Sequence, residues 1–253
     1  MLLRRMFSRK WILTTLLVVA GALVLIRLGV WQLDRLAERR ADNAHYAEML
    51  SLPRLNLNAE IPSQLGEMEY RAATAVGTYD FENQIAVRNQ VYRDQYGYHL
   101  LTPLRFESPT GAGETAVFVD RGWIPLEGNT TPAAWRKYDA PESVEISGVI
   151  RLGQSKPAFG GIADALPLDG SKLEVWNNAD LAMIANQMPY PVLKIYVQLD
   201  EAIDNETPPI SSAPEFEATE GPHFGYALQW FVFAAILFFG YPFFLRKQDV
   251  DFP

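Results

Sequence analysis

The chain has 253 residues, with 22 basic and 30 acidic side chains, a formal net charge of −8 and no cysteine. The acidic balance argues against nucleic acid as a partner, because phosphate binding needs a clustered basic face. The lack of cysteine excludes disulfides, thiolate nucleophiles and cysteine-based metal sites. With three histidines and none of the common catalytic motifs, the sequence predicts neither an enzyme nor a metal site.

Two apolar segments lie near the ends of the chain. The first covers residues 11–33 and has Arg27 as its only charge, and the second covers residues 223–245. A bilayer core about 30 Å thick needs about 20 apolar residues in a helix, so both segments are long enough. Arg27 is tolerated near one end if it snorkels or faces protein. We therefore predict two transmembrane helices.

The distribution of charge predicts the orientation of these helices. Residues 1–10 carry four basic side chains and no acid, and Arg246 and Lys247 directly follow the second segment. The positive-inside rule then places both termini in the cytoplasm of a bacterial cell, with the chain crossing its inner membrane twice. The expected divisions are a tail at 1–10, a helix at 11–33, an exported domain at 34–222, a helix at 223–245 and a tail at 246–253.

The segment between the helices has a β-rich pattern. After a helical continuation over 34–50, apolar residues alternate with polar ones most clearly in 143–152 and 192–200. Weaker strand signals cover 71–79, 84–91, 98–106, 115–121 and 173–176. One helix is expected at 179–188, capped by Asn177 or Asn178, and 204–222 is expected to be an irregular tether. The predicted fold is an α+β membrane protein whose two terminal helices flank a mainly antiparallel β sandwich or barrel with one or two short helices.

Polar and aromatic side chains gather where the two helices meet the exported segment. His223, Tyr226 and Trp230 follow one another at helical spacing and share a stripe. Trp31 and Arg35 stand one turn apart on the other helix. An aromatic belt with snorkelling cations explains Trp31, Trp230 and Arg35.

That belt does not explain Gln32 and Gln229, because amides near hydrocarbon cost free energy unless they are paired. His223 is either a ligand or an interfacial histidine.

A second group of residues lies inside the exported segment. Arg121-Gly122-Trp123 ends a predicted strand, and it is either a structural corner, with Gly122 at positive φ, or a partner contact. His99, on a predicted strand, is expected to be a partly buried and satisfied side chain. His45 is expected to be solvated.

Six motifs, in order along the chain, are similar to those of one family. They are Gly29-Val30-Trp31-Gln32 with Arg35, Gly77-Thr78-Tyr79, Gly97 to Leu104, Val119 to Pro125, Gly148 to Arg151, and His223-x-x-Tyr226-x-x-x-Trp230. Together with two predicted spans, they resemble the Surfeit locus 1 family of cytochrome c oxidase assembly proteins. Gly29, Trp31 and Gln32 belong to its G-x-W-Q-x-x-R signature.

The resemblance implies a membrane-anchored assembly factor without catalytic activity. Its partners would be the catalytic subunit of cytochrome c oxidase, other oxidase assembly factors and the lipid bilayer. It further implies binding of haem a, with His223 as the iron ligand, Tyr226 and Trp230 as an apolar wall, and Arg35 or Arg27 near the propionates.

Two alternatives stay open. One is a structural accessory protein of the oxidase that never contacts haem. The other is a membrane-tethered sensor whose exported domain binds a small ligand, although tails of 1–10 and 246–253 leave little room for an output domain.

Overall fold

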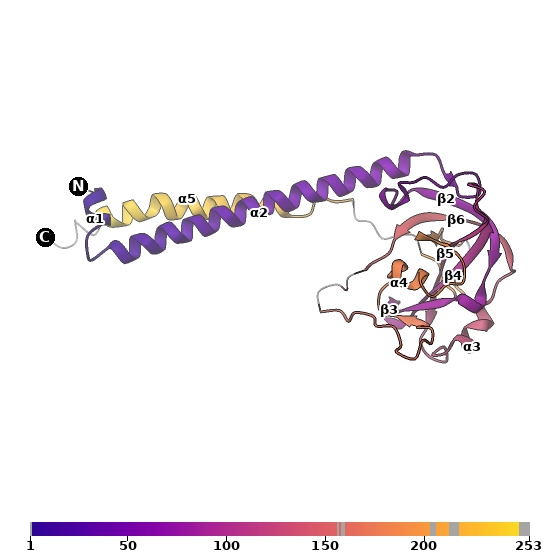
Figure 1. The fold of residues 1–253 in the computed structure, drawn as a ribbon. Helices are drawn as coiled ribbons and strands as arrows, with labels where there is room; N and C mark the ends of the chain where they lie inside the picture. The colour runs from indigo at the N-terminus through magenta and orange to yellow at the C-terminus, as the bar shows by residue number, and fades with distance from the viewer. Residues whose placement is uncertain (1, 156, 158–159, 203–205, 213–217, 248–253) are drawn as a thin grey trace. The chain divides into compact units, whose positions relative to one another are not determined.

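The computed structural model describes the chain except residues 1, 156, 158–159, 203–205, 213–217 and 248–253 (Figure 1). The elements in chain order are α1 (Leu2–Met6), α2 (Ile12–Ser51), β1 (Leu55–Asn56), η1 (Leu65–Glu67), β2 (Ala72–Tyr79), η2 (Phe81–Asn83), β3 (Ile85–Tyr92), β4 (Gln95–Glu107), β5 (Glu114–Pro125), α3 (Pro132–Trp135), η3 (Arg136–Tyr138), β6 (Ser143–Leu152), β7 (Val175–Trp176), α4 (Leu181–Ala185), β8 (Val192–Leu199) and α5 (His223–Lys247). They form two units, one of Met1–His45 with Glu217–Pro253 and one of Tyr46–Phe216.

The first unit is an antiparallel pair of long apolar helices, α2 and α5. Both are long and apolar enough to cross a membrane, and only 11% of the most apolar stretch of α2 and 17% of that of α5 are buried. Helices with so much exposed apolar surface differ from the core helices of soluble proteins. The predicted pair of terminal apolar helices is therefore confirmed, and α2 also includes the expected continuation over 34–50.

Small residues set the distance between these two helices. Gly29, Ala227 and Ala234 are all buried. A β-carbon on Gly29 would lie 2.6 Å from Cε1 of Phe231, closer than carbon atoms can approach. The absence of a side chain at Gly29 is thus what lets the Phe231 ring pack against the backbone of α2.

We predict that Gly29→Ala separates the helices or displaces the Phe231 ring. Overpacking of this kind costs about 1–3 kcal/mol, more than alanine gains in helix propensity. The matched control is Gly240→Ala, because a β-carbon there meets nothing within 4 Å. Thermal unfolding in detergent should show a lower midpoint for Gly29→Ala and an unchanged or higher one for Gly240→Ala. Equal shifts would contradict this packing.

The second unit is built on one eight-stranded sheet that closes on itself. Its order is β1-β2-β6-β8-β5-β4-β3-β7, and β2 also pairs with β4, so β2, β6, β8, β5 and β4 form a ring. The ring closes where Thr78 and Tyr79 pair with Arg105 and Leu104. Of the two predicted architectures, the structure has the barrel, with β3 and β7 extending from the far end of β4.

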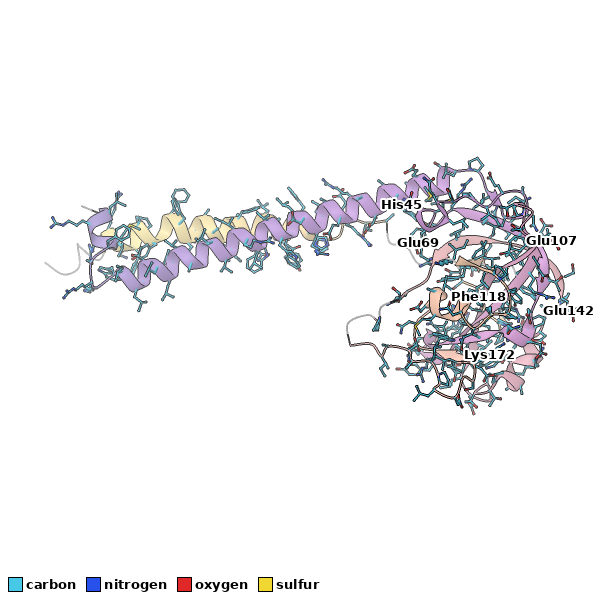
Figure 2. The ribbon with its side chains drawn as sticks, viewed as in Figure 1. His45, Glu69, Glu107, Phe118, Glu142 and Lys172 are labelled. Carbon is cyan, nitrogen blue, oxygen red and sulfur yellow. The ribbon has the colours of Figure 1, made fainter. Side chains whose placement is uncertain are left out.

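Alternation along the strands separates two apolar cores. Val117 and Val119 of β5 point into the barrel with Ile195 and Val197 of β8. Phe118 points the opposite way and packs with buried side chains of α4. Figure 2 shows Phe118 within the unit and Glu107 and Glu142 at its rim.

Most strand pairs are antiparallel, as predicted, but three are parallel. These are β1–β2, β3–β7 and β5–β8. Alternation of apolar residues shows which face of a strand is buried and carries no information about the direction of the neighbouring strand. The alternation of apolar residues therefore could not predict the three parallel pairs.

Two local predictions need correction. The helix expected at 179–188 is shorter, Leu181–Ala185, and its cap is Asp180, whose carboxylate accepts from the Met183 N–H at 3.1 Å. Asn177 and Asn178 lie three and two residues before this cap position, and their side-chain amides donate to Asp164 instead, each at 2.9 Å.

The expected tether over 204–222 includes residues outside the described part of the chain, and its described residues 210–212 are docked on the β unit, where Gln198 donates to the carbonyl of Ser212 at 2.8 Å. Ile210 is buried, and its backbone exchanges two 2.8 Å hydrogen bonds with Trp123. Because the segment around Ile210 is polar and contains prolines, the sequence did not predict that this residue would be buried.

Candidate functional site on the helix pair

A hydrogen bond joins the two motif regions of the helix pair. Nδ1 of His223, the first residue of α5, lies 2.8 Å from Oε1 of Gln32 on α2. The amide oxygen can only accept, so Nδ1 carries the proton and donates. In the neutral ring Nε2 then holds a lone pair, which is the form in which histidine binds a metal.

Gln32 therefore has the partner that an amide near hydrocarbon needs. Both side chains are half-buried, so the bond is shielded on one side and open on the other. An acceptor on Nδ1 also holds the imidazole ring in one orientation.

The aromatic side chains of the motifs are arranged next to this pair. Tyr226 is 49% exposed and Trp31 is 42% exposed. Trp230 is half-buried and packs edge-to-face on Phe233 with ring centroids 6.2 Å apart. Tyr226 and Trp230 follow His223 by one and two turns of α5, so an apolar surface continues from the histidine along the helix.

The two cations considered for this site are engaged in exposed ion pairs on their own helix. Nη1 of Arg35 lies 2.8 Å from Glu38, and Nη1 of Arg27 lies 3.9 Å from Asp34. Exposed pairs of this kind contribute at most about 1 kcal/mol, so a competing anion can replace either carboxylate at little cost.

A second buried polar contact lies at the other end of the helix pair. The Thr15 hydroxyl and the Tyr241 hydroxyl are 2.6 Å apart and buried. Sequence reasoning did not single out these two residues. The sequence could have pointed to them, because each is a polar side chain within an otherwise apolar segment.

Arg121, Gly122 and Trp123 lie in the β unit and are built into its interior. The Arg121 guanidinium is buried and lies over the rings of Tyr79 and Phe81, at 5.5 and 5.1 Å from their centroids. It donates to Oε1 of Gln84 at 3.1 Å and to the carbonyl of Tyr138. Burial raises the pKa of the Tyr79 hydroxyl to about 12, against the opposing charge of Arg121. These contacts satisfy the arginine within the fold.

Gly122 has the positive φ, +114°, that the structural interpretation requires. A β-carbon there would lie 2.3 Å from the carbonyl oxygen of Ile210. The glycine thus permits both the turn of the strand and the docking of Ile210 on Trp123.

We predict that Gly122→Ala destabilises the β unit, by about 1–3 kcal/mol from the backbone alone and more from the overlap with Ile210. Gly111→Ala is the matched control, since Gly111 also has positive φ, +74°, but open space around it. Thermal unfolding measures the difference. Equal destabilisation would show that the approach of Ile210 contributes nothing.

His99 is the partly buried, satisfied histidine that its strand predicted. Its Nδ1 lies 2.8 Å from Oδ2 of Asp120, which is itself buried. Burial disfavours the charged ring, but the charge and hydrogen bond of Asp120 outweigh it and raise the pKa of His99 above its ordinary value.

This raised pKa predicts a pH-dependent stability. The folded protein holds the proton more tightly than the unfolded chain, so the stabilisation is complete below a pH of about 6.5 and lost as the pH rises through the folded pKa. The unfolding midpoint should therefore fall over this range in the native protein and in a His45→Gln control. The fall should be smaller in His99→Gln, and an identical pH profile in that variant would contradict the assignment.

Two apolar terminal helices that are long enough to cross a membrane, with a β-barrel unit between them in the sequence, define the class of protein. Comparison with known proteins identifies the family, since residues 19–235 match the SURF1 family. The chain belongs to the SURF1 family, which is known in general for oxidase assembly and not for catalysis.

Relatives from distant organisms align with nearly the whole chain. Surfeit locus protein 1 of Arabidopsis thaliana is 22% identical over 92% of this chain and 77% of its own length. A SURF1-like protein of Rickettsia bellii is 26% identical over 88% of this chain and 87% of its own length. One of Mycobacterium tuberculosis is 26% identical over 94% and 84% respectively.

Proposed function

We propose that the protein is a membrane-anchored assembly factor for cytochrome c oxidase that holds haem a on His223 and presents it to the catalytic subunit. The observation that carries the proposal is the hydrogen bond from Nδ1 of His223 to Gln32. With the proton on Nδ1, the lone pair of Nε2 is the one that can bind iron. Membership of the SURF1 family supports the oxidase as the process served.

The membrane supplies the setting for this activity. Apolar helices with exposed sides and basic residues at 1–10, 246 and 247 support two spans with both termini in the cytoplasm of a bacterial cell. The β unit would then lie outside the inner membrane. Gln32, near the middle of α2, and His223, at the start of α5, would lie at the outer surface.

Haem a fits the residues present at this end of the pair. His223 would hold the haem iron through its imidazole, and the stripe that Tyr226 and Trp230 continue would offer the macrocycle an apolar surface. Arg35 or Arg27 can exchange an exposed carboxylate for a haem propionate. An open site with a single protein ligand suits a cargo that has to leave, and other oxidase assembly factors would meet the protein at this stage.

The experiment is an optical spectrum of the protein purified in detergent from cells that make haem a. We expect Soret and α bands in the native protein and in His45→Ala, and their loss in His223→Ala with helix content retained. Haem bands that persist in His223→Ala would contradict the ligand assignment. If the native protein contains no haem, and oxidase assembly in the same cells still depends on the protein, the carrier function would be contradicted.

The role of Gln32 is separable from that of the ligand. We predict that Gln32→Glu retains haem and lowers its reduction potential, because a carboxylate accepting from Nδ1 makes the imidazole a stronger donor. Gln32→Leu should shift the potential the opposite way and loosen binding about 10- to 100-fold, the range for lost ligand support. Redox titration followed at the α band measures this. The same potential in both variants would leave Gln32 with a packing role only.

The second candidate function is a scaffold that stabilises the oxidase without touching haem. The Thr15–Tyr241 contact favours it, because a buried polar bond also ties the helices where no ligand is expected. In that case Gln32 and His223 would be a second tie of the same kind. His223→Ala should then lower oxidase assembly in proportion to the loss of helix pairing, with no haem in any preparation.

A further inference from the structure

Polar side chains form a row across four adjacent strands of the β unit. Arg151 of β6 pairs in register with Tyr196 of β8. Asp120 of β5 pairs with Gln198 of β8 on one side and with Leu101 of β4 on the other. Because Val119, Ile150 and Val197 point into the barrel, Asp120, Arg151 and Tyr196 point to the opposite face. His99, bonded to Asp120, completes the row.

A clamped loop covers this face. Asp164 accepts two hydrogen bonds from Asn177, through its backbone and side-chain nitrogens at 2.7 and 2.9 Å, and two from Asn178, both at 2.9 Å. The pKa of Asp164 is lowered because these bonds outweigh its partial burial. The asparagines are therefore fixed above the row.

Between row and cover lies a cavity of about 220 Å³ with mainly polar walls. It is lined by His99, Asp120, Arg151, Tyr196, Gln90 and Asn178, among others. A space of this size accommodates a molecule of a few non-hydrogen atoms and is too small for a macrocycle. It lies wholly within the β unit and is separate from the helix site.

The carboxylates near the cavity have partners already. Oδ2 of Asp120 bonds to His99, and its Oδ1 accepts from the Gly122 N–H at 3.0 Å. Glu69, labelled in Figure 2, accepts from Nε of Arg151 at 3.2 Å. Their charge is thus compensated within the fold, and the groups left over are donors.

Two residues of the row, Tyr196 and Arg151, have hydrogen-bond donors that the other described residues leave unused. Among the described residues, the Tyr196 hydroxyl makes no hydrogen bond, and burial raises the pKa of this group to about 12, so it keeps its proton. Arg151 uses Nε for Glu69 and Nη1 for Gln198, and its Nη2 bonds to nothing else that the structure describes. Nε2 of His99, which Asp120 does not engage, is a third donor when the ring is protonated, the form that the charge of Asp120 favours.

We infer that this cavity is a binding site for a small oxyanion of carboxylate size, held by the Tyr196 hydroxyl, Nη2 of Arg151 and the His99 ring. Charge-assisted hydrogen bonds from a guanidinium and a phenol are the usual means of holding such a group. The cover formed by Asn177 and Asn178 would exclude bulk water from it. The inference is independent of haem, since no residue of the helix pair takes part.

The test uses the full chain in detergent and ¹³C-labelled acetate as the probe. Broadening of the acetate NMR line reports binding, and unlabelled inorganic phosphate is then added as a competitor. Displacement by phosphate assigns the site to oxyanions in general, and resistance to phosphate assigns it to carboxylates. Acetate that shows no broadening with the native protein overturns the inference.

Two tyrosine variants provide the comparison. Tyr196→Phe removes only the hydroxyl and should weaken acetate binding about tenfold, as expected for one hydrogen bond to a charged ligand. Tyr190→Phe is the control, because that hydroxyl donates to Asp80 at 2.6 Å outside the cavity, and its acetate affinity should be unchanged. Equal affinity in both variants would show adventitious binding and overturn the inference.

Loss of folding in Tyr196→Phe would be recognised by near-ultraviolet circular dichroism. Arg151→Lys then carries the same expectation, since lysine keeps the charge beside Glu69 but lacks Nη2. Native affinity in a folded Arg151→Lys protein would equally contradict the site.

Discussion

The packing and the proposed chemistry of the helix pair depend on the hydrogen bond between His223 and Gln32, which are 191 residues apart in the sequence. Two apolar helices have little hydrophobic reason to associate in a bilayer, because lipid tails are as apolar as their side chains. Their association depends on close packing and on polar contacts. Gly29 provides the first against Phe231, and the contacts of Gln32 with His223 and of Thr15 with Tyr241 provide the second.

The same bond connects helix packing with the proposed chemistry. By accepting from Nδ1, Gln32 stabilises the helix pair and at the same time selects the tautomer with a lone pair on Nε2. A haem carrier needs a ligand that is oriented before the cargo arrives and released when it leaves. A half-exposed imidazole held by a neutral amide would meet both requirements of the proposed carrier, whereas a carboxylate partner would make the imidazole a stronger and less reversible donor to iron.

The sequence predicts the positions of elements better than their neighbours. Alternation located the strands at Ser143–Leu152 and Val192–Leu199 almost to the residue, because a half-buried strand has to alternate. It could not show that β8 runs parallel to β5, or that Ile210 docks on Trp123, since these depend on contacts between distant segments. For the site, the cost of an unpaired amide indicated that Gln32 needs a partner, and only the structure identified His223 as that partner.

The most direct test of this account is cross-linking of residues 32 and 223 in the native membrane. The chain has no cysteine, so Gln32→Cys with His223→Cys gives a background-free pair for a short bis-maleimide. We expect efficient cross-linking of this pair and none between Gln32→Cys and Phe243→Cys, which lies near the far end of α5. Cross-linking of 32 with 243, or failure of 32 with 223, would contradict the antiparallel pairing and with it the proposed haem site.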